Sequence, residues 1–572
     1  MPGFFATNAY TDYCIASTEE KTICNQLKSQ HLSASRATLA KFENDKTFFI
    51  DDKYLLIQEG YLLNKIELFN EYSCNDINEL LSKMYEKEGD DFFKFFRGCF
   101  SGLLIDFIED KWVAFTNQIG DCPLFYMQYE NVFTVGSQVD YLIDYCKKNK
   151  VPLSFNESCA YQLLTYGFVI NDETFSKEIK RLQGGYYLVF QNGVLSIKQY
   201  HCFTKDDKKY KELSEEELIE LLDEGFKKAV SLEWRKDDEY HYNHLADLSG
   251  GLDSRMNVWV AHVIKKRHAT LLTFCKSQYL DEIIAEKIAE FWKDEMIFKP
   301  LDDASFLYDI DELTRMNGGL SLYSGITGGK QLLQSLNMSR FGIEHTGMIG
   351  DVVIGSFLKY RDASRNLKST GMYSELLKDK LPDHLKNYHK QFFDHELFLL
   401  YTRAFQGACN SHLIRRHYTE VGSPFLNVDF LQLCLNFPIE MRMGHCIYKK
   451  WIAKKYPKAA SYKWEKTRSL ISDSKLIVFS RKACHRFLLM VGKYLKIDQL
   501  RSREMNPLDY WIEKDNNLNH YLTGYYSRSI EKGRKFLSDN LQNDIKWLFT
   551  SGSAVEKTMV LTVLSAVNLY MR

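Results

Sequence analysis

The stretch that decides the fold is Leu248-Ser249-Gly250-Gly251-Leu252-Asp253-Ser254. The apolar segment before it predicts a strand that ends at Leu248, and the apolar run 256–261 after it predicts a helix. Two glycines between a strand and a helix let the backbone approach a phosphate closely, because no Cβ stands in the way. The first N–H groups of a helix have no partner within it and attract an anion. The stretch therefore predicts a phosphate-binding loop.

The polar side chains of this loop indicate what binds beside the phosphate. Ser249 and Ser254 supply hydroxyl donors, whereas Asp253 would repel a bare phosphate. The aspartate therefore implies a cation such as Mg²⁺ between its carboxylate and the phosphate. The loop is not of the Walker type, since no Gly-Lys-Ser/Thr follows it. The alternative is a strand–turn–helix junction that only requires glycine, and it gives no reason for the two serines and the aspartate.

The sequence around the loop is typical of an α/β fold. From about residue 240 short apolar segments alternate with amphipathic helical segments such as 281–292 and 397–407, which predicts a parallel sheet with helices packed on it. After about residue 390 the pattern is almost wholly helical. The apolar run 560–571 is shorter than the roughly 18–20 residues needed to cross a bilayer, so we expect a packed C-terminal helix there.

The N-terminal part has a different pattern. Residues 1–145 are β-rich, with short apolar and aromatic segments separated by Gly, Asp and Asn. The strands that we expect there are 53–63, 99–107, 112–117 and 123–128. The run 186–200 predicts a hairpin around Asn192-Gly193, a pair that favours a type I′ turn. We place the domain boundary in the charged stretch near residue 210, with domains 1–210 and 211–572.

Composition limits the classes of partner. The 572 residues include 74 basic and 75 acidic side chains, a net charge of −1, so no overall field attracts nucleic acid or an anionic membrane. Thirteen cysteines show no CxxC pair and no spacing typical of a zinc site. Cys99, Cys275 and Cys434 lie in apolar runs, where we expect reduced, buried thiols. We therefore expect a cytoplasmic protein with small-molecule partners, and a homodimer is left open.

Five segments, in the same order, resemble the asparagine synthetase family. The stretch 249–254 resembles the pyrophosphate loop of the N-type ATP pyrophosphatases, which release AMP and pyrophosphate. The other four segments that carry the resemblance are Asp281-Glu282 with Ala285 and Ala289, 346–355, 422–427 with the helix after it, and 456–466. The family includes the β-lactam and carbapenam synthetases and the lasso-peptide cyclases. The resemblance implies a doubly wound parallel-sheet PP-loop ATPase domain with a helical C-terminal part.

The resemblance also implies roles for particular residues. The residues that would hold ATP are Leu248, Ser249, Gly250, Gly251, Asp253, Ser254 and Gly347. Asp253 and Asp351 would bind Mg²⁺, and Lys466 would stabilise charge on the phosphates, so Lys466 and Asp351 are the expected catalytic residues. Attack of a carboxylate on the α-phosphorus develops negative charge that a metal ion and a fixed ammonium group can stabilise. Taken alone, Asp351 could cap a turn and Lys466 could be a surface lysine.

The N-terminal half resembles the class II glutamine amidotransferases, which implies an Ntn-type αββα glutaminase-like fold. The resemblance lies in the segments 60–68, 96–100 and 120–126. Pro2 stands where that family has its nucleophilic cysteine, and it has no thiol to form a thioester. Glu59 replaces the asparagine that stabilises the oxyanion, and its charge would repel that oxyanion. We therefore expect this half to be inactive as a glutaminase.

The synthetase half also departs from the family. Met348 stands in place of a glutamate implicated in handling ammonia, Val352 in place of an acid, and Arg255 in place of a serine. We expect retained adenylation with a rebuilt acceptor side. His345, Glu344 and Tyr323 lie near the segment 346–355, but each is expected to be structural, so no general base for the amine is identified.

The sequence thus predicts ATP-dependent amide-bond formation with ATP and Mg²⁺ as cofactors. A substrate carboxylate would be adenylated with release of pyrophosphate. An amine, either intramolecular or from a second substrate, or free ammonia would then attack, without glutamine hydrolysis. Two alternatives stay open: a lasso-type peptide macrocyclase and a non-catalytic nucleotide-binding regulatory protein. A carboxylate-dependent exchange of pyrophosphate with ATP would separate the two enzymes from the regulatory protein.

Overall fold

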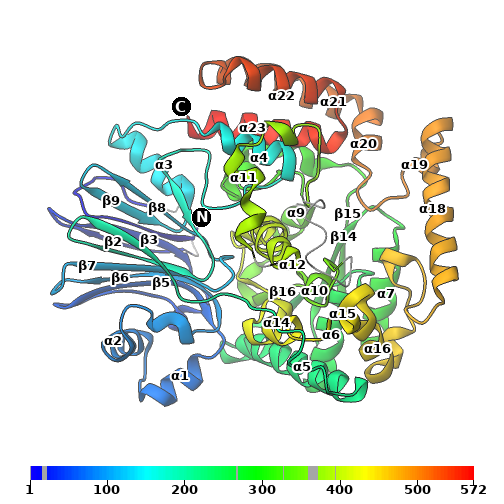
Figure 1. Ribbon diagram of the computed structural model, residues 1–572, viewed down its shortest axis with the longest axis horizontal. Helices are drawn as coiled ribbons and strands as arrows, with labels where there is room; N and C mark the ends of the chain where they lie inside the picture. Colours follow the sequence, from blue (N-terminus) through cyan, green and yellow to red (C-terminus); the bar gives the residue numbers. More distant parts are fainter. Residues whose placement is uncertain are drawn as a thin grey trace.

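The computed structural model describes residues 2–15, 22–265, 268–325, 328–358, 371–392 and 394–571. The β-rich N-terminal part lies at the left of Figure 1, and the parallel sheet with most of the helices lies at the right. No helix in these described residues is long and apolar enough to cross a membrane. The cytoplasmic location stays a prediction.

Two six-stranded antiparallel sheets stack on each other in the N-terminal part (Figure 1). The first sheet has the order β10 (Lys180–Leu182), β8 (Leu124–Tyr129), β9 (Val132–Gly136), β1 (Gly3–Thr7), β3 (Ser33–Leu39) and β2 (Thr22–Lys28). The second has the order β12 (Val194–Gln199), β11 (Tyr186–Gln191), β7 (Lys111–Thr116), β6 (Gly98–Asp106), β5 (Tyr54–Leu62) and β4 (Thr47–Ile50). The strands expected from the sequence are present within one or two residues.

Alternation along the strands builds four layers. In β5, Leu55 and Ile57 pack between the two sheets, whereas Leu56 packs with helices α1 (Lys65–Tyr72) and α2 (Ile77–Glu88) on the outer side. Successive side chains of a strand point to opposite faces, so each sheet can bury both of its faces. Helices α3 (Val139–Lys148) and α4 (Glu157–Tyr166) belong to the cluster on the other outer side. The predicted αββα arrangement is therefore confirmed.

The β11–β12 hairpin forms the turn that its sequence predicts. Asn192 and Gly193 connect the strands, and both have positive φ values, of 52° and 77°. A type I′ turn requires positive φ at both central residues, which asparagine and glycine tolerate best.

The third sheet is parallel and doubly wound. Its strand order is β15 (Glu295–Pro300), β14 (Thr270–Cys275), β13 (Asn243–Asp247), β16 (Phe341–His345) and β17 (Val421–Gly422). All four strand pairs are parallel. The chain first adds β14 and β15 on one side of β13, and then returns to add β16 and β17 on the other side. The switch point therefore lies between β13 and β16, where such sheets bind ligands at the carboxyl ends of the strands.

Helices cover both faces of this sheet. Ala246 and Leu271 pack in the cluster that includes α5 (Glu215–Glu239), α6 (Leu252–Lys265) and α7 (Leu280–Trp292). Their neighbours Leu245 and Leu272 point the other way, toward α9 (Gly328–Gln334). Strands buried on both faces are typical of parallel sheets. The segment 397–407, expected as one α-helix, is the end of α12 (His395–Leu399) followed by a π-helix, η8 (Leu400–Gly407).

The C-terminal part is helical, as expected, and it packs on both halves. The remaining helices used below are α8 (Ile310–Met316), α10 (Gly350–Val353), α16 (Cys446–Lys455), α18 (Lys475–Leu495), α19 (Asp498–Arg501), α20 (Leu508–Lys514), α21 (Asn516–Gly533), α22 (Asp539–Ser551) and α23 (Ala554–Tyr570). Leu163 of α4, Leu313 of α8 and Leu564 of α23 share one core cluster. Helices α21, α22 and α23 lie along the top of the molecule in Figure 1. The boundary near residue 210 stays a prediction.

One expectation about the cysteines is wrong. Cys99, expected as a reduced thiol, forms a disulfide with Cys122, and their Cα atoms lie 5.9 Å apart. The two residues are 23 positions apart in sequence and meet because β6 and the turn before β8 come together. The spacing of these two cysteines in the sequence does not predict the disulfide, because the pairing depends on the order of the strands in space. Cys275 and Cys434 are free and buried, as expected.

Candidate functional site

The glycine loop lies at the switch point of the parallel sheet. β13 ends at Asp247 and α6 begins at Leu252, four residues earlier than the expected helix at Met256. Asp253 and Ser254 therefore lie in the first turn of α6, where the N–H groups have no carbonyl partner within the helix. This is the part of the fold in which an anion is best stabilised.

The serines of the loop fix its shape. The Ser254 hydroxyl accepts a hydrogen bond from the Ser249 amide at 3.1 Å and lies 2.9 Å from the Ser249 hydroxyl. The Ser249 hydroxyl in turn accepts from the Gly251 amide at 3.1 Å. A Cβ on Gly251 would meet only this hydroxyl within 4 Å. The space around this Cβ position is otherwise open, which is what close approach of a phosphate requires.

The loop is held from below by a carboxylate. The Gly250 amide donates to Asp281 at 2.7 Å, and a Cβ on Gly250 would lie 3.0 Å from both Glu465 Cβ and Ile284 Cδ1. Burial and the neighbouring Glu465 carboxylate raise the pKa of Asp281 to about 6. Asp281 thus has a positioning role for the loop, and glycine at 250 has a packing reason.

Arg255 ties the loop to the segment that leads to Lys466. Its guanidinium is fully buried and donates to the Gly250 carbonyl at 2.9 Å. It also donates to three carbonyls between residues 459 and 463, those of Ala459 at 3.1 Å, Tyr462 at 3.2 Å and Lys463 at 2.6 Å. Arginine can reach four carbonyls because its donors form a planar fork. Arg255 therefore joins the two segments of the site.

The two predicted metal ligands and the predicted lysine meet in one place. The Asp351 amide donates to Asp253 Oδ2 at 2.8 Å, and Lys466 Nζ lies 2.8 Å from Asp351 Oδ2. Tyr448 donates to Asp253 Oδ1 at 3.0 Å. Burial and the Asp351 carboxylate raise the pKa of Asp253. Two neighbouring carboxylates with one lysine leave a local excess of negative charge that a cation would relieve.

The glycines around these carboxylates leave room for nothing larger than hydrogen. A Cβ on Gly347 would lie 2.3 Å from the Ser254 amide nitrogen, and a Cβ on Gly350 would lie 2.5 Å from Asp253 Cγ. The segment 347–351 can therefore press Asp351 against the first turn of α6. Carboxylate oxygens at an anion-binding helix end are the donor set that Mg²⁺ with a polyphosphate prefers, so these residues fit ATP and Mg²⁺.

A cavity of about 510 Å³ opens beside the Asp351–Lys466 pair. Most of its lining is apolar or aromatic. The large apolar and aromatic side chains of its wall are Phe168, Leu322, Phe357, Tyr373 and Leu399. Its size suits a small-molecule ligand, since such pockets hold about 300–1,000 Å³.

The π-helix η8 contributes one wall of this cavity, including Arg403, Ala404 and Gly407. Arg403 donates to the Gly371 carbonyl at 2.9 Å, and its guanidinium carbon lies 5.4 Å from the centre of the Tyr373 ring. π-Helical turns occur frequently at functional sites. Asp351 and Lys466 are thus shared by the glycine-loop region and a mostly apolar cavity with one further cation.

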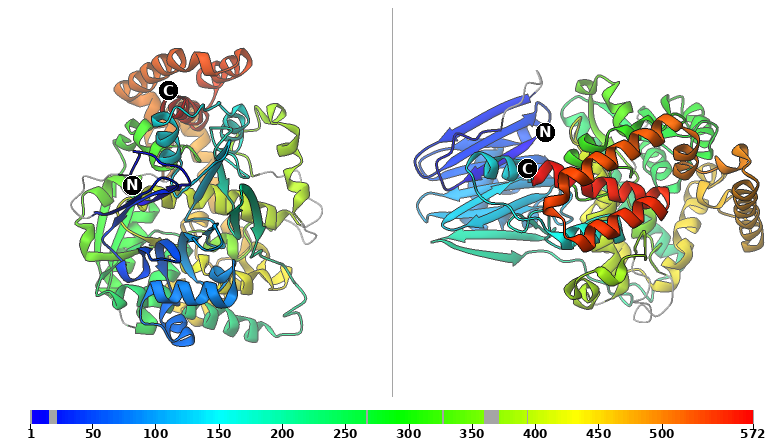
Figure 2. Two further views of the ribbon diagram at one scale, coloured as in Figure 1. Left: turned by 90° about the vertical axis from the view of Figure 1, so that its left-hand side faces the viewer. Right: turned by 90° about the horizontal axis from the view of Figure 1, so that it is seen from above.

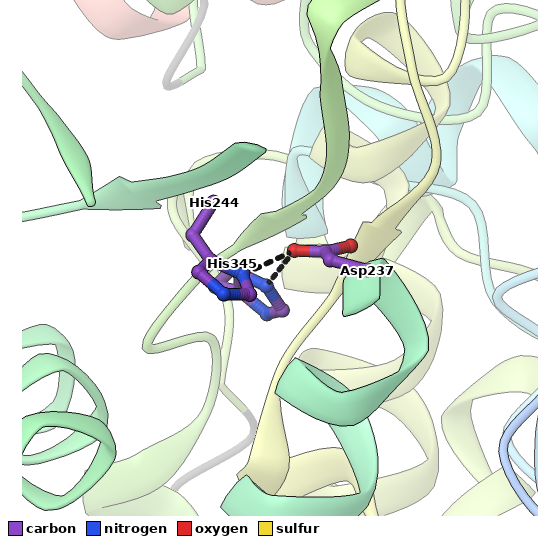
Figure 3. Close-up of side chains that lie close together, drawn as sticks. All are labelled: Asp237, His244 and His345. Carbon is purple, nitrogen blue, oxygen red and sulfur yellow. Dashed lines mark hydrogen bonds and ion pairs between the residues drawn. The ribbon is translucent and has the colours of Figure 1, made fainter. Parts of the chain in front are cut away.

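The histidine expected to be structural belongs to a buried charge cluster (Figure 3). His345 is fully buried, with Nε2 2.7 Å from Asp237 and Nδ1 2.8 Å from Glu233, and these carboxylates raise its pKa to about 9 against the effect of burial. His244 Nδ1 lies 2.9 Å from the same Asp237 oxygen. The cluster joins α5 to β13 and β16.

The arrangement of Asp237, His244 and His345 also resembles a metal-binding group. Protons already join these atoms at hydrogen-bond distances, and both nitrogens of His345 face carboxylates. A metal ion needs unprotonated nitrogens about 2.0–2.1 Å away, so it would have to push these atoms apart. We interpret the cluster as structural.

The other two neighbours of the segment 346–355 are structural as well. Glu344 is buried and pairs with Arg415, which also binds Asp247 at 2.8 Å. Tyr323 is fully buried and donates to the Leu307 carbonyl at 3.1 Å. No residue in this group faces the cavity.

The glutaminase-like half has a pocket of only about 50 Å³, close to the start of β1 and the end of β5. Its lining includes Pro2, Gly3, Glu59 and Cys122. Cys122 is the one cysteine of this lining, and it is bonded to Cys99. Glu59 accepts from the Thr38 hydroxyl at 2.6 Å and lies 3.6 Å from Arg36. Among the described residues that line this pocket there is thus no free thiol, and the Glu59 carboxylate is hydrogen-bonded at one oxygen and lies near a cation at the other.

Charged contacts close the junction between this pocket and the parallel sheet. Lys46 lies 2.8 Å from Glu420, and Arg416 lies 3.1 Å from Asp121. Burial works to raise the pKa of Glu420, but Lys46 and Arg416 hold it below its usual value. The two halves therefore meet through buried ion pairs.

Several residues of this site are not predicted by the sequence pattern. Tyr448, Arg403 and the cavity wall come from segments far from the glycine loop, and only the folded chain brings them near Asp253 and Asp351. The two residues that depart from the asparagine synthetase pattern in segment 346–355, Met348 and Val352, lie in different surroundings. Met348 packs at the edge of the core beneath α6, and Val352 lines the cavity.

Comparisons with known proteins support the N-terminal assignment. Residues 40–201 match the model of a glutamine amidotransferase domain. No curated protein matches the chain in sequence. Among solved structures, the glutamine phosphoribosylpyrophosphate amidotransferase from B. subtilis, complexed with ADP and GMP, matches at 9% identity with a TM-score of 0.23. The match covers 48% of this chain and 52% of that one.

A second structure, described as the allosteric regulatory enzyme of purine biosynthesis, matches at 8% identity with a TM-score of 0.24. It covers 48% of this chain and 60% of the other. The chain thus spans little more than half the length of these two proteins, and similarity at this level has no bearing on function. The N-terminal part has an Ntn-like amidotransferase fold, and a parallel α/β part follows it.

Proposed function

We propose that this protein is an ATP-dependent, AMP-forming amide ligase or cyclase of the asparagine synthetase family, with an inactive glutaminase half. One observation supports this most strongly. Asp253, Asp351 and Lys466 converge at the amino end of α6, where a helix dipole would stabilise a polyphosphate, and two of them line the neighbouring cavity.

The reaction has two steps. An oxygen of the substrate carboxylate attacks the α-phosphorus of ATP, the bond to the bridging oxygen breaks, and pyrophosphate leaves with the electron pair. An amine then attacks the acyl carbon, loses a proton, and AMP leaves with the acyl–oxygen electron pair. The product is an amide, and one ATP is converted to AMP and pyrophosphate.

The residues of the site divide this work. The glycine loop binds the phosphates, and Lys466 stabilises the negative charge that develops at the α-phosphoryl oxygens. Asp253 and Asp351 would hold Mg²⁺, which supplies charge neutralisation of the triphosphate when bound. Arg255 fixes the loop relative to the segment of Lys466, so that both meet the nucleotide in one geometry.

The amine does not come from glutamine. The glutaminase-like pocket has no free thiol, and the carboxylate of Glu59 lies where an oxyanion would need a neutral donor. Free ammonia, an amine on a second substrate, or an amine within the substrate itself is the nucleophile.

The cavity favours an acid with an apolar body. Its aromatic and aliphatic wall gains most from burying apolar surface, while a polar amino acid would leave this surface without partners. The carboxylate of the substrate would point toward the Asp351–Lys466 end, and Arg403 would bind a second anionic or hydroxyl group.

Exchange of labelled pyrophosphate into ATP tests the proposal. We expect exchange that requires Mg²⁺ and a carboxylic acid, and that is faster with aryl or branched alkyl acids than with aspartate. Binding of ATP without exchange for any acid in a broad panel would favour a non-catalytic nucleotide-binding protein. Release of glutamate from glutamine by the purified protein would contradict the inactive glutaminase half.

A further inference from the structure

Helix α18 stands apart from the body of the protein. It lies at the right-hand edge of Figure 1 and projects from the molecule in the right-hand view of Figure 2. It packs along one side, against α19 and the segment around η12 (Glu465–Thr467). Of its 21 residues only Gly492 is fully buried. A helix this exposed gains little stability from tertiary packing, so its composition needs another explanation.

The exposed face of α18 is apolar. Leu476, Phe479, Phe487, Met490 and Tyr494 are 81%, 72%, 58%, 63% and 87% exposed. With Ala483 they follow one another at steps of three or four residues, which places them on one face of the helix. We call these six residues the α18 stripe. Val478 and Leu489 lie on the opposite side and are half-buried.

The charge of α18 has a single sign. Residues 475–496 contain six basic side chains and no acidic one, although the chain as a whole has a charge of −1. Lys475, Lys482, Arg486 and Lys493 follow at steps of seven, four and seven residues, so they form a row along one edge of the stripe. Positive charge is thus concentrated beside the apolar face.

The four cations of this row form no ion pair with the described residues of the protein. Arg481 lies 3.9 Å from Asp473, and none of the other five basic side chains of 475–496 pairs with a carboxylate in the part of the chain that the structure describes. The neighbouring helix α16 provides a contrast. Its Lys450, Lys454 and Lys455 each pair with a glutamate of α5. The row on α18 is therefore available to an external anion.

We propose that α18 binds the surface of a membrane that contains anionic phospholipid. A helix with aromatic and aliphatic residues on one face and lysine and arginine beside it lies flat in the headgroup region, with its apolar face buried. The basic row adds attraction to the negative surface, and this attraction is local because salt screens charge beyond about 8 Å. The near-zero net charge of the whole chain therefore does not oppose it.

A second copy of the chain is a less favourable partner for this face. Two α18 helices packed through their stripes would bring two sets of unpaired lysines and arginines together, and like charges repel. An anionic surface supplies the charge that the stripe lacks. This proposal does not depend on the proposed function, and it concerns only where the protein resides.

Vesicle sedimentation with the full-length protein tests it. The probes are vesicles of phosphatidylcholine alone and of phosphatidylcholine mixed equally with phosphatidylserine. We expect the protein to sediment with the anionic vesicles only, and to be released as salt is raised.

Two double variants separate the contributions of the α18 stripe and the basic row to vesicle binding. Phe479→Ser with Phe487→Ser should weaken binding about tenfold or more, by removing apolar surface that enters the interface. Lys482→Glu with Arg486→Glu should weaken it about 25-fold or more, since each basic residue near the surface contributes roughly fivefold. These side chains are exposed, so the far-ultraviolet dichroism and melting temperature should not change.

The chain offers matched controls away from α18. Ile108→Ser with Val194→Ser removes exposed apolar residues of the N-terminal part, and Lys532→Glu with Lys535→Glu reverses exposed charges on the C-terminal helices. Both should bind as the wild type does. The proposal is overturned if the wild type ignores anionic vesicles, or if the α18 variants bind unchanged. It is also overturned if the protein is a dimer that Phe479→Ser with Phe487→Ser dissociates, because the stripe would then be an interface between copies.

Discussion

In the N-terminal half, the pocket carboxylate Glu59 accepts from Thr38 and lies 3.6 Å from Arg36, and Glu420 of the C-terminal half, which lines the same pocket, pairs with Lys46. In the C-terminal half, Asp253 and Asp351 lie side by side with one lysine beside a cavity. The pocket of the first half holds about 50 Å³ and the cavity of the second about 510 Å³.

This difference shows that a domain can keep a fold without keeping the unpaired charges that chemistry at its pocket would need. Buried charges that satisfy one another stabilise an interface, whereas neighbouring carboxylates with too few cations create a demand for an external one. Changes to the paired charges at the junction should therefore affect stability, and changes to Asp253, Asp351 or Lys466 should affect catalysis.

The largest effect is expected at the cavity end. Lys466→Ala removes the ammonium that stabilises the phosphoryl charge and should lower the exchange rate about 10²–10³-fold. The measurement is carboxylate-dependent pyrophosphate exchange, and the unfolding midpoint should stay the same because Lys466 is exposed. Lys463→Ala, three residues away and also exposed, is the matched control and should exchange normally. Equal rates for both variants would contradict the role of Lys466.

Arg255 connects the loop to the lysine segment, so it should affect both properties. Arg255→Met removes the guanidinium donor from four backbone carbonyls, of which that of Gly250 keeps the Glu465 amide, and we expect a loss of about 3 kcal/mol in the free energy of unfolding. The folded variant should also exchange pyrophosphate more slowly, because the loop is no longer fixed. Denaturant unfolding and exchange per folded molecule would show this. Full stability in the variant would mean that the bonds of Arg255 are not needed.

The ion pairs at the junction between the two halves should affect stability but not pyrophosphate exchange. Lys46→Met leaves Glu420 buried with one partner fewer, and breaking such a pair costs about 3 kcal/mol of stability. The exchange rate per folded molecule should remain that of the wild type. A variant that keeps its stability but loses exchange would remove the distinction between the two regions.

The His345 cluster predicts a dependence of stability on pH. Its pKa is raised to about 9 by Asp237 and Glu233, with His244 as the other titratable neighbour. A raised pKa stabilises the folded state below the unfolded value of about 6.5, and this stabilisation is lost as pH rises toward 9. We expect the free energy of unfolding to fall by roughly 2–3 kcal/mol between these pH values. His345→Gln should flatten this part of the profile, and an unchanged slope would contradict the charged state of His345.

The smallest effect concerns the substrate. Arg403→Gln should raise the KM for the acid about tenfold and leave kcat similar, because the interaction is present in both ground and transition states. Steady-state exchange at varied acid concentrations would separate the two constants. A fall in kcat with constant KM would instead place Arg403 in the chemistry.

The glycine loop and its surroundings could be predicted because their signals are local. Ser249, Gly250, Gly251 and Asp253 follow one another between a strand and a helix, and Asn192-Gly193 determines its own turn. The αββα layers follow from alternation along strands such as β5. Patterns with a period of two or of 3.6 residues are visible without knowledge of distant contacts.

The features that escaped prediction depend on contacts between distant segments. The Cys99–Cys122 disulfide forms because β6 meets the turn before β8, and three of the four bonds of Arg255 end at residues about 200 positions away. The basic row of α18 escaped for another reason. Summing charge over the whole chain gives −1 and conceals a helix in which all charges are positive.

Calorimetric titration with ATP, with and without Mg²⁺, is the most direct test of the central claim that the loop and the two aspartates bind a metal-bound triphosphate. We expect saturable binding that requires Mg²⁺ in the wild type and is lost when Asp253→Asn and Asp351→Asn are combined in a variant that still folds. Heat that is the same without Mg²⁺, or the same in the double variant, would contradict the account.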